Sequence, residues 1–187
     1  CINVIITEIA DPYYNWSDSR YIELYNNGDS PVNLSQMVLR VWRGPYSSSE
    51  PSPDFELTGT IDPGEFFFVC YKADVFNQTF GLTCDIETIS DTAGNTDGYD
   101  RIALVYAGEV VDMFGDPGTH ISYSGHNFWD GRVERALLNI TASATWNAAL
   151  LNSLDGWNVY SVAEGGQHQF APEDFDAGAW IGACADG

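Results

Sequence analysis

A group of oxygen-bearing side chains lies between residues 91 and 100, where the sequence reads DTAGNTDGYD. Asp91, Asn95, Asp97 and Asp100 supply carboxylate and amide oxygens at short spacing. Calcium accepts roughly six to eight such oxygens, so the segment predicts a calcium site, although no glutamate follows at the offset that an EF-hand requires. The alternative is an acidic turn whose Asp and Asn side chains accept hydrogen bonds from their own backbone.

The other residues with chemical potential do not form a recognisable catalytic pattern. His120 and His126 share one loop, and His168 or Asp116 could complete a zinc site, but the plainer interpretation is exposed loop histidines. The sequence contains no Gly-x-Ser-x-Gly motif, no Cys-x-x-Cys pair and no glycine-rich phosphate loop. We therefore expect that the protein is not an enzyme.

Aromatic residues are abundant, with six Trp, ten Tyr and ten Phe. Two clusters stand out, PYYNW at residues 12–16 and HNFW at residues 126–129. Exposed rings can pack against the apolar faces of sugars, so these clusters predict a carbohydrate-binding platform. The alternative is that the rings anchor loops onto the core.

Four cysteines allow three disulfide pairings. Cys70 and Cys84 follow a strongly hydrophobic segment at short separation and are expected to form a local bridge, which leaves Cys1 and Cys184 to join the two ends of the chain. Closing the local loop stabilises the fold by about 3 kcal/mol in the chain-entropy model. A lipid-modified or inter-subunit Cys1 is the alternative.

Four Asn-x-Ser/Thr sequons occur, at Asn15, Asn33, Asn77 and Asn139. Together with cysteines that can pair, they indicate a eukaryotic secretory route, and we expect N-glycosylation and an extracellular location. The chain opens without a signal peptide, so we interpret it as a mature product or as one domain of a longer chain.

The charge of the chain excludes two classes of partner. Seven Lys and Arg face 27 Asp and Glu, for a formal net charge of −20. Nucleic acids and anionic membranes attract clustered cations, and the sequence has no such cluster. No apolar run reaches the roughly 18 residues needed to span a bilayer.

The first two-thirds of the chain shows the pattern of short strands separated by turns, which is typical of a β-sandwich. We expect a central strand at residues 65–71 and a hairpin at 102–114 that turns at Ala107 and Gly108. The remaining predicted strands are 2–10, 20–25 and 37–42. In the last third, residues 132–138 and 142–151 are expected to form short helices, and Trp157 and Trp180 to anchor the irregular remainder.

The order and spacing of several segments resemble the lamin-tail domain family, and in particular its secreted microbial or algal members with a C-terminal extension. The matching segments are IITEIA at 5–10, RYIELYNNGD at 20–29, VNLS at 32–35, IDPGEFFF at 61–68, DGYDRIAL at 97–104 and VDMFG at 111–115, followed by FWDGRVER at 128–135 and FDAGAWIG at 175–182. The resemblance implies an all-β, immunoglobulin-like sandwich that acts in binding and assembly without conserved chemistry of its own.

The predicted organisation is a sandwich over residues 1–118, with an irregular extension over 119–187 packed on it as one structural unit. We expect a secreted, N-glycosylated structural module that associates with itself into a fibre, coat or surface appendage, for example through strand addition at residues 2–9. The alternative is a carbohydrate- or protein-binding module, assisted by calcium, that belongs to a larger secreted protein. No cofactor other than calcium is expected.

Overall fold

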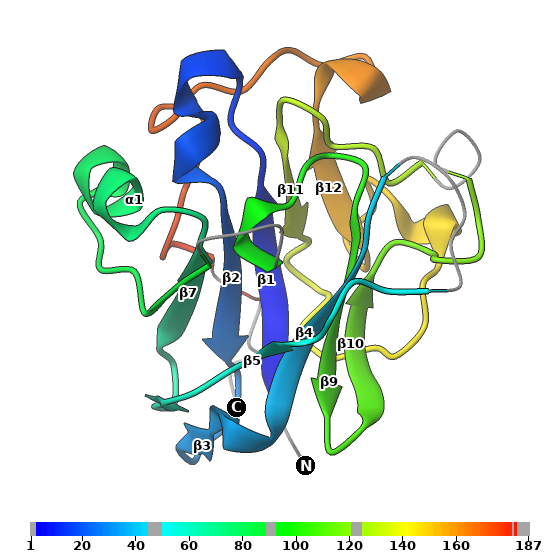
Figure 1. Ribbon diagram of the computed structural model, residues 1–187. Helices are drawn as coiled ribbons and strands as arrows, with labels where there is room; N and C mark the ends of the chain where they lie inside the picture. Colours follow the sequence, from blue (N-terminus) through cyan, green and yellow to red (C-terminus); the bar gives the residue numbers. More distant parts are fainter. Residues whose placement is uncertain (1–2, 45–49, 89–92, 121–124, 181, 183–187) are drawn as a thin grey trace.

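The computed structural model of the chain describes all residues except 1–2, 45–49, 89–92, 121–124, 181 and 183–187 (Figure 1). Most of the described secondary structure is β-sheet, with one α-helix and several short 3₁₀ turns. No helix within the described part of the chain has the length and apolar character needed to cross a membrane.

The larger sheet has six strands in the order β12-β11-β1-β2-β7-β8. All neighbours are antiparallel except β7 and β8, which run parallel. The strands are β1 (Val4–Ala10), β2 (Tyr21–Asn26), β7 (Phe66–Cys70), β8 (Ile86–Glu87), β11 (Arg132–Arg135) and β12 (Trp157–Tyr160).

The smaller sheet has four strands in the order β10-β9-β4-β5, and a separate pair, β3 with β6, completes the β-structure. The strands are β4 (Met37–Trp42), β5 (Phe55–Glu56), β9 (Arg101–Tyr106), β10 (Glu109–Phe114), β3 (Val32–Asn33) and β6 (Thr60–Ile61). The predicted hairpin is confirmed: Ala107 and Gly108 both have positive φ, 49° and 90°, as a two-residue turn that matches strand twist requires.

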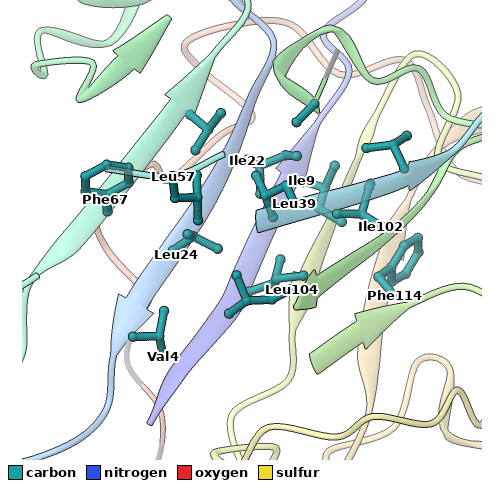
Figure 2. Close-up of a cluster of buried hydrophobic side chains, with 14 of the residues drawn as sticks. Val4, Ile9, Ile22, Leu24, Leu39, Leu57, Phe67, Ile102, Leu104 and Phe114 are labelled. Carbon is teal, nitrogen blue, oxygen red and sulfur yellow. The ribbon is translucent and has the colours of Figure 1, made fainter. Parts of the chain in front are cut away.

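The core lies between the inner faces of the two sheets (Figure 2). Apolar residues alternate along the strands, so each strand delivers one row of side chains inward. In β1 the register shifts between Ile6 and Glu8, and this bulge allows Val4, Ile6 and Ile9 to share the inner face despite their uneven spacing. The all-β, sandwich-like architecture expected from the sequence is therefore present.

The outer face of the larger sheet is covered as well. Helix α1 (Ala73–Phe80), which ends at the left-handed Gly81, packs Phe76 against Tyr21 of β2. Phe175, in the segment that leads to the C-terminus, packs on the same ring. Because this face is covered, Tyr21 and Glu23 of β2, which point away from the sandwich core, are also buried.

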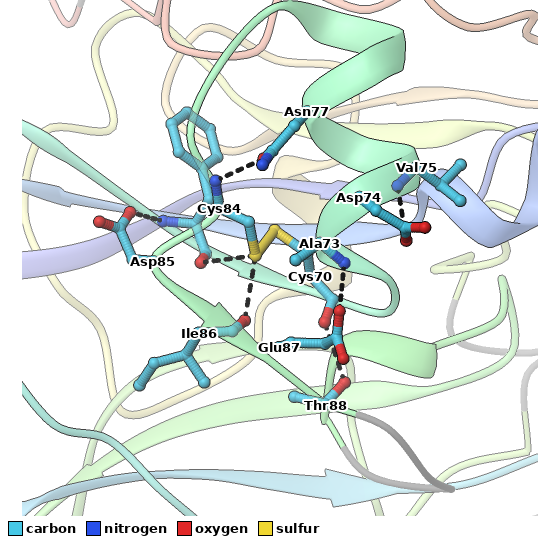
Figure 3. Close-up of a disulfide and its surroundings, with 11 residues drawn as sticks. Cys70, Ala73, Asp74, Val75, Asn77, Cys84, Asp85, Ile86, Glu87 and Thr88 are labelled. Carbon is cyan, nitrogen blue, oxygen red and sulfur yellow. Dashed lines mark hydrogen bonds between the residues drawn. A yellow bond between two sulfur atoms is a disulfide. The ribbon is translucent and has the colours of Figure 1, made fainter.

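A disulfide fixes α1 to the sheet (Figure 3). It joins Cys70, at the end of β7, to Cys84, just before β8, with a Cα–Cα distance of 6.1 Å. The side chain of Asn77 on α1 accepts a hydrogen bond from the Cys84 N–H at 2.9 Å. The local pairing is thus confirmed, whereas Cys1 and Cys184 lie outside the described residues.

The two predicted helices are wrong. Residues 132–135 form β11, which pairs with β1 and β12, because Arg132, Val133, Glu134 and Arg135 alternate between the two faces of the sheet. In 142–151 only the 3₁₀ turn η4 (Ala148–Leu150) forms. Ser143 and Asn147 bond the backbone two residues ahead, and such local hydrogen bonds compete with a helix.

Three expectations about strand position also change. β7 lies between β2 and the short edge strand β8, not at the centre of the sheet. β1 lies between β11, which pairs with Glu8–Ala10, and β2, which pairs along Val4–Ala10, so strand addition at residues 2–9 stays a prediction that could use only the β11-side edge of residues 4–7. Residues 119–187 contribute β11 and β12 to the larger sheet, so this part is less irregular than expected. Trp157 and Trp180 are buried, as predicted for anchors.

Candidate ligand-binding surface

Asp11 brings together three segments that are distant in the sequence. It follows β1 directly, and its side chain is buried. Its Oδ2 atom accepts hydrogen bonds from the N–H groups of Gly98 at 3.0 Å and Asp130 at 3.2 Å, and its Oδ1 atom accepts one from Arg20 Nε at 2.6 Å. Burial raises the pKa of Asp11, while the charge of Arg20 lowers it. The two aromatic clusters noted in the sequence are therefore held at the same end of the sandwich, uppermost in Figure 1.

A fourth segment, residues 167–170, completes this end of the molecule. The Tyr13 N–H donates to the Gln169 carbonyl, and the Gln169 N–H donates to the Asp130 carbonyl, both at 3.0 Å. The ring of Tyr13 stacks on His168 with a centroid distance of 4.0 Å and meets Phe170 edge-on at 5.6 Å. No local pattern in the sequence points to this segment, because it approaches Tyr13 only through long-range backbone pairing.

Exposed rings of these segments all lie at this end of the sandwich, and we refer to them together as the aromatic surface. Tyr14 is 72% exposed, Phe170 46%, Trp129 43% and Trp16 38%, although large aromatic side chains are usually well buried. Trp129 is supported by Tyr99, whose ring stacks on it at 6.2 Å. The aromatic surface comprises Tyr13, Tyr14, Trp16, Trp129, His168 and Phe170.

Carboxyl groups border these rings. Asp130 lies 3.5 Å from His168, measured from Oδ2 to Nδ1. Burial raises the pKa of Tyr99, and the nearby charges of Asp97, Asp130 and Asp11 raise it further. Ring faces beside hydrogen-bond acceptors can bind a molecule that has both apolar C–H faces and hydroxyl donors, and sugars have this combination.

The predicted calcium ligands accept hydrogen bonds from within the protein. Arg20 Nη1 donates to Asn95 Oδ1 at 2.9 Å, and the Tyr99 N–H donates to Asp97 Oδ1 at 3.0 Å. The carboxylate of Asp100 is buried, and burial raises its pKa to about 7. The Asp97 contact matches the alternative of an acidic turn, whereas Asn95 bonds a side chain 75 residues away in the sequence. Asp91 lies outside the described residues, and among the described residues no group of three or more His, Cys, Asp and Glu side chains is arranged to hold a metal.

The histidines occupy different surroundings. His126 is buried, contrary to the expectation of an exposed loop residue, and it packs edge-on against Phe114 at 6.1 Å and Trp146 at 6.2 Å. Burial lowers its pKa to about 3, so it is neutral at physiological pH. His168 stacks on Tyr13 in the aromatic surface.

The four sequon asparagines differ in accessibility. Asn15, Asn33 and Asn77 are exposed, on η1 (Tyr14–Ser19), on β3 and on α1. Asn139 is half-buried, and its side chain is held at both ends: Arg135 Nη1 donates to Oδ1, and Nδ2 donates to the Gly156 carbonyl, both at 2.9 Å. A glycan is attached through Nδ2, so this contact sets Asn139 apart from the other three.

No protein-family model matches the sequence, and no curated protein shows significant similarity to it. The lamin-tail resemblance therefore stays a prediction from the residues.

Proposed function

We propose that the chain is a secreted carbohydrate-binding module of the lamin-tail type, and that the aromatic surface holds the sugar. The observation that carries this proposal is the convergence of exposed rings from residues 13–16, 129 and 168–170 on one end of the sandwich. Ring faces with polar groups beside them offer a sugar both an apolar contact and hydrogen-bond acceptors. The Cys70–Cys84 disulfide and the three exposed sequons are compatible with the secretory route.

The composition of the surface narrows the ligand. Asp97 and Asp130 lie beside the rings, and the whole chain carries a net charge of −20. Sulfated and uronic-acid glycans would be repelled, so the favoured ligands are neutral or amine-bearing sugars.

A glycan array followed by calorimetry tests the proposal. The wild type is expected to bind a neutral or amine-bearing glycan. Trp129→Ala and Tyr14→Ala are each expected to weaken binding about tenfold, because each removes a ring contact worth roughly 1.4 kcal/mol. Glu109→Ala is the control, because Glu109 is exposed at the turn between β9 and β10, at the opposite end of the sandwich from the aromatic surface (Figure 1). Absence of any bound glycan, with and without calcium, would count against the proposal.

Self-association is the second candidate. Leu137, Leu138 and Leu154 are each at least half exposed, and the Leu138 N–H donates to the Leu154 carbonyl, so these apolar residues lie close together. Exposed apolar patches of this kind can mark contacts between proteins. Sedimentation would show an oligomer that Leu138→Asp converts to monomer, whereas a monomer over the whole concentration range would exclude this contact.

A further inference from the structure

Three glutamates lie side by side on the outer face of the larger sheet. In the strand register Glu8 of β1 is opposite Glu134 of β11 on one side and opposite Glu23 of β2 on the other. Like charges directly opposite one another destabilise a sheet, so this glutamate row is costly when all three groups are ionised. Glu8 and Glu23 are nevertheless buried, at 1% and 0% exposure.

The segment from Phe170 to Trp180, which we call the strap, covers this row. The Gly178 N–H donates to Glu23 Oε2 at 2.6 Å. Beyond it, the indole of Trp180 donates to the Arg135 carbonyl at 2.7 Å. Phe175 is buried against the rings of Tyr21 and Phe80. The strap therefore separates Glu8 and Glu23 of the row from water.

The charges around the row are not balanced. Arg132 lies 3.2 Å from Glu8 and 3.5 Å from Glu134, and it also pairs with Asp176 of the strap. The other groups facing the row are neutral: Thr7, Tyr21 and Tyr160, with Phe76 and Phe80 from α1. Among the described residues, Arg132 is the cation that pairs with Glu8, Glu134 and Asp176. If these three groups and Glu23 were all ionised, the buried Glu8 and Glu23 would carry more negative charge than this one guanidinium balances.

Protonation relieves this excess. Burial raises the pKa of Glu23 to about 7, and burial raises that of Glu8 well above its ordinary value even beside Arg132. A carboxyl group whose pKa is raised in this way is most readily ionised in an arrangement that exposes it to water. Lifting the strap would hydrate the row without opening the sandwich core.

The strap is also continuous with the aromatic surface. Phe170 is its first residue, and the preceding Gln169 bridges Tyr13 and Asp130 through backbone hydrogen bonds. Movement of the strap therefore disturbs the position of His168 and Phe170 against Tyr13.

We propose that the glutamate row and the strap form a pH-sensitive latch: the strap is closed while the row holds its protons, and it opens as the row ionises with rising pH, weakening ligand binding at the aromatic surface. Only the effect on ligand binding rests on the proposed function. Opening of the strap stands on the row itself and is measured separately.

Hydrogen exchange of the strap amides at pH 5 to 8.5, expressed as protection factors, tests the latch without a ligand. In the wild type the protection of residues 173–180 is expected to fall at least tenfold over this range, while that of β9 stays constant. Glu23→Gln, which keeps a neutral acceptor for the Gly178 N–H, is expected to hold the strap protected at every pH. Glu173→Gln is the matched control: it removes the same charge from an exposed position on the strap and should behave as the wild type.

Constant protection in the wild type across the range would overturn the latch. So would a fall in Glu23→Gln equal to that in the wild type. Glu8→Gln provides a second variant if Glu23→Gln does not fold. For a glycan that binds the wild type at pH 5.5, affinity at pH 8.5 is expected to fall at least fivefold, and this loss should be absent in Glu23→Gln. If no glycan binds, the proposed function fails while the exchange result still decides the latch.

Discussion

At the scale of single residues, Arg135 and Asp112 form an ion pair that joins the two sheets. Arg135 of β11 and Asp112 of β10 are each 1% exposed and are hydrogen bonded to one another. Asp112 also accepts from the Ile6 N–H at 2.8 Å, and Arg135 Nε donates to the Ile6 carbonyl at 2.6 Å. The two side chains thus provide hydrogen-bond partners for the Ile6 N–H and carbonyl at the bulge of β1, where the regular pairing of the strands is interrupted.

We expect Asp112→Ala to lower the free energy of unfolding by about 3–5 kcal/mol, because it leaves a buried guanidinium without its counter-charge. Asp54→Ala serves as control: it breaks the exposed pair with Arg40 and should cost less than about 1 kcal/mol. Urea unfolding measures both. Equal losses in the two variants would mean that the buried pair has no special role.

Asn139 is expected to carry no glycan, because its Nδ2 is used by the Gly156 carbonyl and its Oδ1 by Arg135. Glycopeptide mapping of secreted material should find occupancy at Asn15, Asn33 or Asn77 and an unmodified Asn139. Asn139→Gln should destabilise the fold by about 1–2 kcal/mol, unlike Asn15→Gln. Full occupancy at Asn139 would show that these contacts are not formed in the secreted protein.

At the scale of elements, the disulfide determines how firmly α1 is held. Cys70→Ser with Cys84→Ser is expected to lower stability by about 3 kcal/mol and to increase hydrogen exchange in α1 more than in β9. The reason is that α1 connects the two cysteines and makes few contacts beyond the Phe76 cluster and η1. Uniform exchange across α1 and β9 would contradict this account.

Local sequence pattern predicted the elements whose contacts are local. The hairpin of β9 and β10 and the Cys70–Cys84 bridge are of this kind, since their partners lie close in the sequence. β11 was mistaken for a helix, because four residues are too few to show a clear period and its partners β1 and β12 are distant.

The same limit explains which parts of the site were missed. The aromatic clusters at 12–16 and 126–129 were visible in the sequence, but their convergence depends on Asp11. In β2, Tyr21, Glu23 and Tyr25 alternate with apolar residues, a pattern typical of a solvent-facing row. The strap that buries this row comes from about 150 residues further along, as the bond from Gly178 to Glu23 shows, with a separation of 155.

At the scale of the whole molecule, the raised pKa of Glu23 links stability to pH. The folded protein holds this proton up to about pH 7, whereas an unfolded glutamate, at its ordinary value of 4.5, releases it earlier. The raised pKa of Glu23 therefore contributes on the order of 3 kcal/mol to the free energy of unfolding below pH 4.5, and this contribution is lost as the pH rises to 7. Urea midpoints at pH 4.5, 6 and 8 should show a smaller decline in Glu23→Gln than in the wild type. Identical slopes would contradict the assignment.

The most direct test of carbohydrate binding at the aromatic surface is an NMR titration that follows the tryptophan indole N–H signals as a glycan from the array is added. The six tryptophans provide an internal control, because Trp129 and Trp16 are exposed in the aromatic surface while Trp157 and Trp180 are each 5% exposed. We predict saturable shifts of the Trp129 and Trp16 signals, with those of Trp157 and Trp180 unchanged. Binding that shifts neither Trp129 nor Trp16 would place the ligand elsewhere and contradict the proposed site.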